Sequence, residues 1–117
     1  MYRLSGLVDV GVDMGGDGTK SGGVAATLTI PAGVTLAQKT PDDYIVVQRG
    51  SKIVANGTRS KPIRFTAASA IDGSLTNPDS ASGLWGGIVI LGKAPINKCS
   101  NDVRGTAACE RVVEGST

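Results

Sequence analysis

The chain offers few candidate catalytic residues, because the 117-residue sequence contains no histidine. That absence removes the commonest general base and the Ser-His and Cys-His nucleophile systems. Two cysteines, Cys99 and Cys109, are too few for a four-ligand zinc site. The glycine-rich stretch 14–23 lacks the spacing of a phosphate-binding loop, and the neighbouring Asp13 and Asp17 lack the ligand pattern of an EF-hand. The sequence therefore predicts no cofactor and no metal site.

The acidic residues are poorly arranged for acid–base catalysis. Asp42 and Asp43 are adjacent, and successive residues of a strand point to opposite faces, so this pair suits a turn. Glu110 and Glu114 lie in the C-terminal tail. Catalysis requires titratable groups that converge on one point, and the sequence brings no such set together. We interpret the acidic residues as solvated loop charges and the chain as not an enzyme.

Composition and charge exclude several classes of protein. Twelve basic and ten acidic side chains give a net charge of +2 without a dense basic cluster, which argues against nucleic-acid binding. No amphipathic run is long enough for a helical bundle, and no stretch approaches the ~20 apolar residues that span a bilayer. Seventeen glycines and only four aromatic residues are typical of short strands joined by tight turns.

Short apolar segments with period-two alternation are the main structural signal in the sequence. They cover residues 2–13, 26–30, 34–36, 44–47, 53–55, 62–66 and 84–93. The last segment holds the only tryptophan, Trp85, and the polar stretch 69–82 before it is expected to be a loop. Aligning Gly33 with Gly50 puts Ile30 over Val47, an offset of 17 positions that is close to the ~20-residue coil of a solenoid.

Two all-β architectures fit this pattern. A two-sheet sandwich also has short strands with frequent turns, and Asn56-Gly57 could close a hairpin. The glycine register and the scarcity of other two-residue hairpin turns favour a solenoid. We therefore predict a short parallel β-helix of about three to four coils.

Four sequence blocks, in order, resemble a family of bacterial secreted or cell-surface proteins, often lipoproteins, with a right-handed parallel β-helix of the pectate-lyase type. The blocks are residues 26–36, 49–58, 62–66 and 84–97. The resemblance implies a right-handed helix and an extracellular or cell-surface location, although the N-terminus lacks the apolar region of a signal peptide. Because the family continues with further coils, we expect 1–117 to be one β-helix domain and a fragment of a longer protein, with coils in 24–97 and a disulfide loop and tail in 98–117.

The two cysteines bracket a polar loop after the strongest apolar segment. In a protein that resembles secreted ones, this arrangement indicates a structural disulfide between Cys99 and Cys109. The alternative is a redox-active pair, but the Cys-x-x-Cys spacing that tunes a thiol pKa is absent.

A solenoid that ends on an open coil exposes unpaired strand edges. We therefore expect a homo-oligomer that buries Trp85, Ile88 and Ile90, and a non-catalytic structural or surface-binding role. The alternative is a polysaccharide-binding or polysaccharide-degrading β-helix, with carbohydrate as the partner and catalytic residues in further coils. Arg49, Lys52, Arg59, Lys61 and Arg64 supply cations for it, but the scarcity of aromatic residues argues against it.

Overall fold

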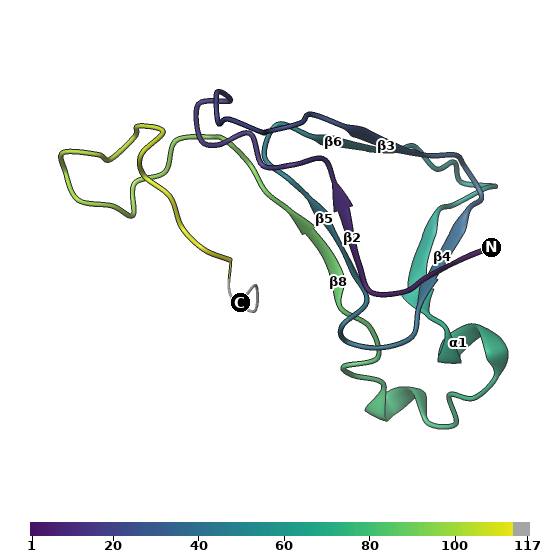
Figure 1. Cartoon of the computed structure of the whole chain (residues 1–117). Coiled ribbons are helices and arrows are strands. Elements are labelled where there is room, and N and C mark those ends of the chain that lie inside the picture. Colours follow the sequence, from purple (N-terminus) through teal and green to yellow (C-terminus); the bar gives the residue numbers. More distant parts are fainter. Residues whose placement is uncertain (114–117) are drawn as a thin grey trace.

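The computed structural model describes residues 1–113, and their strands stack in three parallel sheets. The sheets form the sides of a triangle when viewed along the stack (Figure 1). The first side is β1 (Tyr2–Leu4), β4 (Thr35–Gln38) and β7 (Arg64–Ala67); the second is β2 (Leu7–Val10), β5 (Tyr44–Val47) and β8 (Gly87–Ile90); the third is β3 (Thr27–Ile30) and β6 (Lys52–Ala55). The chain visits the sides in a fixed order, so each strand lies on the equivalent strand of the preceding coil. This is a parallel β-helix with two complete coils and two sides of a third.

The predicted register between coils is wrong. Ile30 pairs with Ala55, whereas Val47 lies between Val10 and Ile90. Gly33 and Gly50 do share a corner conformation, with φ of 84° and 89°, but Gly33 follows β3 and Gly50 follows β5. The two glycines therefore occupy different corners of the triangle, and their similarity reflects the needs of a tight corner.

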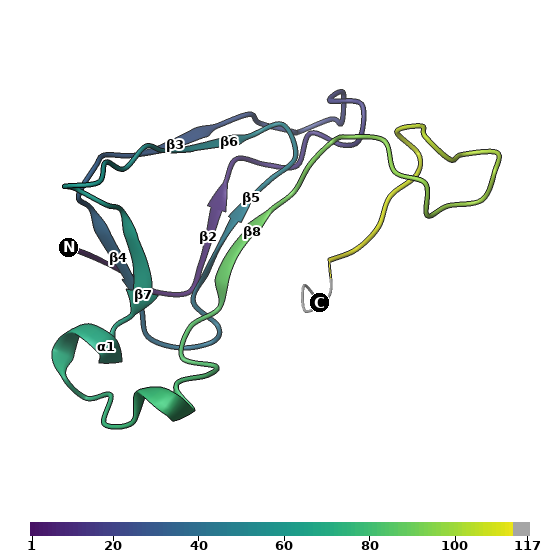
Figure 2. The ribbon, with the colours of Figure 1, turned by 180° about the vertical axis from the view of Figure 1, so that it is seen from behind.

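Two local predictions also need correction. Residues 2–13 form two strands rather than one, because Gly6 turns the chain between β1 and β2 with φ of 73°. These strands already belong to the first coil, so stacking begins N-terminal to the expected coil region 24–97. The expected loop 69–82 contains a short helix, α1 (Ser69–Asp72), and a 3₁₀ turn, η1 (Pro78–Ser80), below the corner between β7 and β8 (Figure 2). In the part of the chain that the structure describes, no helix is long and apolar enough to cross a membrane.

Two aliphatic ladders on the second side form the centre of the core. Val8, Ile45 and Ile88 make one ladder, and Val10, Val47 and Ile90 make the other. Ile45 and Val47, in the middle coil, are each 1% exposed. Partly buried side chains from the other two sides pack against them: Leu4, Ala26, Leu28, Ile53 and Phe65. The middle coil is therefore covered from both ends on two of its sides, by the strands that flank β4 and β5, whereas β6 on the third side pairs only with β3.

Candidate functional site

Both ends of the coil stack leave strand edges unpaired within residues 1–113. At one end, β7 pairs only with β4 and β8 pairs only with β5. At the other end, β1 pairs only with β4 and β2 pairs only with β5. Two side chains at the ends of inward-facing ladders are largely exposed, Ile90 at 64% and Tyr2 at 63%. Each would be covered if another coil lay against it, as Val47 and Leu36 are in the middle coil.

The three residues expected to mediate self-association lie close together at one end of the stack. Ile88 and Ile90 belong to β8, and Trp85 lies in the turn that leads into it. Ile88 is half-buried against Ile45, Trp85 is half-buried, and Ile90 is the exposed member. The Gly86 N–H donates to the Asp43 carbonyl at 2.9 Å, which anchors the turn on the preceding coil.

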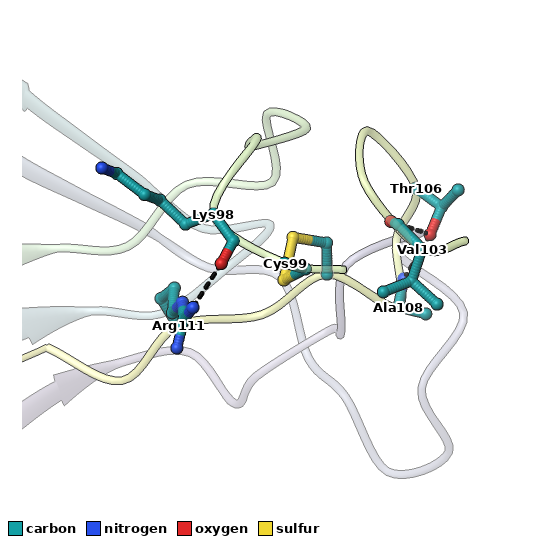
Figure 3. Close-up of a disulfide and its surroundings, with 7 residues drawn as sticks. Lys98, Cys99, Val103, Thr106, Ala108 and Arg111 are labelled. Carbon is teal, nitrogen blue, oxygen red and sulfur yellow. Dashed lines mark hydrogen bonds between the residues drawn. A yellow bond between two sulfur atoms is a disulfide. The ribbon is translucent and has the colours of Figure 1, made fainter. Parts of the chain in front are cut away.

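The predicted disulfide between Cys99 and Cys109 is present, with an S–S distance of 2.13 Å and Cα atoms 5.6 Å apart (Figure 3). The loop that it closes projects away from the triangle (Figure 1). A second tie closes the base of the loop, because the guanidinium of Arg111 donates to the carbonyl oxygen of Lys98. Inside the loop, the Thr106 hydroxyl donates to the Val103 carbonyl at 2.7 Å. The cysteines therefore have a structural role, since both sulfurs are in the disulfide.

An ion-pair cluster centred on Arg49 connects this loop to the coils. The Arg49 guanidinium donates to both carboxylate oxygens of Asp13, at 2.6 and 2.7 Å, and to Oε1 of Glu110 at 2.7 Å. Lys20 adds a contact of 3.2 Å to Asp13. Arg49 is 19% exposed on its side chain, so the cluster is partly shielded from water. It joins the glycine-rich loop, the corner after β5 and the segment that follows the disulfide.

Electrostatics and close packing both stabilise this ion-pair cluster. The hydrogen bonds from Arg49 hold the pKa of Asp13 well below its usual range, and Asp13 and Glu110 together raise the pKa of Arg49. Next to the cluster, a Cβ on Gly16 would lie only 2.4 Å from the Ala107 carbonyl oxygen, so the glycine allows the two loops to touch. The bidentate geometry between Arg49 and Asp13 is the strongest form of ion pair available to these side chains. The cluster therefore straps the disulfide loop to the first two coils.

We expect Arg49→Ala to lower the free energy of unfolding by about 1–2 kcal/mol at low salt, because it removes the guanidinium from both carboxylates and leaves Asp13 with only the exposed Lys20 as an ion-pair partner. Chemical denaturation at low and high salt measures the effect, which should shrink as salt screens the pair. Arg104→Ala is the matched control, because Arg104 is exposed and forms no ion pair within residues 1–113. An equal effect of both substitutions would contradict the stabilising role of the Arg49 ion-pair cluster.

Asp42 and Asp43 lie in the corner between β4 and β5, as predicted, and they have different roles. Asp42 is exposed, whereas Asp43 is 6% exposed. The Asp43 carboxylate accepts three backbone N–H groups, from Gly6 at 2.6 Å, Lys39 at 2.9 Å and Thr40 at 2.8 Å. These bonds lower its pKa, with Gly6 the largest contributor. Asp43 therefore fixes this corner and joins the first coil to the second.

Asp43→Asn should destabilise the chain at neutral pH, because an amide nitrogen then faces backbone N–H donors. Since the folded pKa lies below the usual value of about 4, the carboxylate contributes stability above that pH, and the contribution disappears as pH falls through the folded pKa. The stability difference between wild type and Asp43→Asn should therefore be largest near neutral pH and narrow below about pH 4. Denaturation from pH 7 to 2 tests this. Asp42→Asn is the control, and it should change the free energy of unfolding little at any pH in this range, because Asp42 is exposed. A difference that is constant with pH would contradict the assigned role.

The best-bonded acidic residues have structural partners. Within residues 1–113, no three Cys, Asp or Glu side chains are placed to hold a metal ion. Asp13 and Asp43, the acidic residues with the most hydrogen bonds, are occupied by Arg49 and by backbone N–H groups. Glu114, which the sequence placed in the tail, lies outside the described residues.

The stacked parallel sheets define the class of protein as a parallel β-helix. The family model described as "Pectate-lyase like beta helix domain" matches residues 18–115. The chain therefore belongs to this family. No curated protein and no solved structure matches the chain.

Proposed function

We propose that the chain is a non-catalytic structural module that assembles with further copies of itself through the open ends of its coils. The observation that supports this most directly is the exposure of Ile90, which is 64% exposed although it continues a ladder whose preceding member, Val47, is 1% exposed. A fully inward-facing aliphatic side chain that remains in contact with water leaves favourable burial energy unused. Strand edges that are open in the same place allow further pairing.

A head-to-tail arrangement fits the two ends. Every strand pair in the stack is parallel, so β1 and β2 of a second copy can lie on β7 and β8 in the same direction. That contact would cover Tyr2 of one copy and Ile90 of the other. Because the two surfaces differ, the contact is heterologous and can repeat into longer assemblies. The disulfide supports an extracellular or cell-surface setting, where such bonds persist.

Solution mass by light scattering tests the proposal. Wild type should exceed the 11.8 kDa of one chain at micromolar concentration, and the mass should rise with concentration. Ile90→Lys should give the mass of one chain, because a lysine at the last rung opposes stacking of another coil. Ile71→Lys is the matched control, because Ile71 is 43% exposed on α1, outside the stacked sheets. A wild-type mass of one chain at all concentrations would overturn the proposal.

A further inference from the structure

A groove lies at the corner of the triangle between the first and third sides. It has a volume of about 530 Å³. Two successive corners form it. The turn from β3 to β4 contributes Ala32 and Gly33, and the turn from β6 to β7 contributes Ser60, Lys61 and Pro62. The paired first residues of β4 and β7, Thr35 and Arg64, complete the lining. The groove therefore depends on the stacking of two coils.

Hydrogen bonds fix the backbone at both basic residues of the groove, Lys61 and Arg64. Lys61 closes a turn in which the Thr58 N–H donates to the Lys61 carbonyl at 3.0 Å and the Lys61 N–H donates to the Thr58 hydroxyl at 2.9 Å. The side-chain carbons of Lys61 lie over Gly33, with Cβ 3.5 Å from where a Cβ of the glycine would be. The Arg64 N–H donates to the Val34 carbonyl at 3.0 Å. The two positive side chains thus start from fixed points on one coil and line a shared groove.

No acidic side chain balances these cations. The sequence contains no Asp or Glu in 18–41 or in 44–71, which are the segments that build this corner. Among residues 1–113, the ion pairs connect Asp13, Lys20, Arg49 and Glu110, and none includes Lys61 or Arg64. Arg59 is also exposed in the same turn. The groove is therefore a region of uncompensated positive charge in a chain with a net charge of only +2.

The donors and acceptors in the groove indicate the class of ligand. Lysine and arginine side chains only donate hydrogen bonds, and the hydroxyls of Thr35 and Ser60 can donate as well. Neutral sugars present many hydroxyl donors, but the lining has no carboxylate or amide to accept from them, and its side-chain acceptors are only the hydroxyls of Thr35 and Ser60. Phosphate and sulfate groups present only acceptors, and guanidinium groups bind them in a bidentate manner.

We propose that this groove binds phosphate or sulfate esters, with Lys61 and Arg64 as the principal contacts and Thr35 and Ser60 as additional donors. Arg64 begins β7, which has an open edge, but it is next to the inward-facing Phe65, so the Arg64 side chain points out of the coil and not along the stack. Binding in the groove is therefore a property additional to assembly through the coil ends. A module with both properties would hold an anionic polymer along the corners of its coils. The carbohydrate alternative is thereby restricted to carbohydrates that carry phosphate or sulfate esters.

Amide chemical shifts of the wild-type chain, recorded during separate titrations with inorganic tripolyphosphate, dextran sulfate and polygalacturonate, test the inference. Tripolyphosphate and dextran sulfate should shift the amides of Gly33 and of residues 60–64. Binding of tripolyphosphate alone would assign phosphate as the ligand, and binding of dextran sulfate alone would assign sulfate. Tighter binding of polygalacturonate than of either probe would overturn the assignment, because its charged groups are carboxylates among many hydroxyls.

A pair of double variants with equal charge changes provides the control. Lys61→Gln with Arg64→Gln should weaken binding by about tenfold or more, because it removes two charge-assisted donors. Lys52→Gln with Lys98→Gln removes the same charge from exposed positions outside the groove and should weaken binding only slightly. All four residues are exposed, so both variants should fold. Equal weakening in the two variants would show attraction to net charge alone and would overturn the site.

Discussion

Ile45→Ala will lower the free energy of unfolding by about 2–5 kcal/mol, the largest effect expected of a single substitution in this chain. Ile45 is 1% exposed and lies between Val8 and Ile88 in the middle of its ladder. The substitution removes apolar contacts with the coils on both sides and leaves a cavity that a closely packed stack cannot easily collapse. Urea denaturation followed by circular dichroism measures the loss.

Ile90→Ala is the matched control, because it makes the same chemical change in the neighbouring ladder. Ile90 is 64% exposed, so the substitution should cost less than about 1 kcal/mol in the single chain. The comparison is made at a low concentration at which the chains are separate, because assembly would add stability. Similar losses for Ile45→Ala and Ile90→Ala would contradict the coil register and the position of the core.

Replacing Cys99 and Cys109 together by serine should lower the free energy of unfolding by about 2–3 kcal/mol, according to the chain-entropy model for a loop of this length. The effect should extend to the coils, because the Glu110 carboxylate next to the loop pairs with Arg49 at 2.7 Å. Without the disulfide, ordering Glu110 against Arg49 costs more chain entropy. Denaturation curves of oxidised wild type and of the double variant measure the loss.

Wild type with reductant is the control for the serine substitutions, and it should match the double variant. Adding Arg49→Ala to the double variant should then cost less than Arg49→Ala costs in wild type, because the two changes remove parts of one connection. Full additivity would show that the disulfide and the Arg49 cluster act independently. It would contradict the claim that together they connect the disulfide loop to the coils.

The sequence was sufficient to predict the parallel β-helix and most of its strands, because both follow from short-range patterns. Alternating apolar residues identified the segments around Ile30, Ile45 and Ile53. The polar loop between Cys99 and Cys109, together with the resemblance to secreted proteins, indicated the disulfide. The register between coils could not be predicted in this way. Corners differ greatly in length, from the short turn between β3 and β4 to the insertion that contains α1, so equal spacing of glycines does not mark equal positions.

The ion-pair cluster was missed for a different reason. Arg49 lies 36 positions from Asp13 and 61 from Glu110, and no local pattern connects residues at such separations. Gln38 departs from the alternation, because this polar residue is only 2% exposed in β4, where the pattern favours an apolar side chain. The basic groove also depends on two corners that become neighbours only when the coils stack.

Amide hydrogen exchange at low and high protein concentration tests head-to-tail assembly most directly. Exchange should slow at high concentration in both β8 and β2, because each provides one of the two open edges that pair. β4 and β5 of the middle coil should change little, since each is already paired on both edges. Exchange in β8 and β2 that does not depend on concentration would contradict the account, and slowing in β8 alone would replace head-to-tail stacking with an end-to-end contact between identical surfaces.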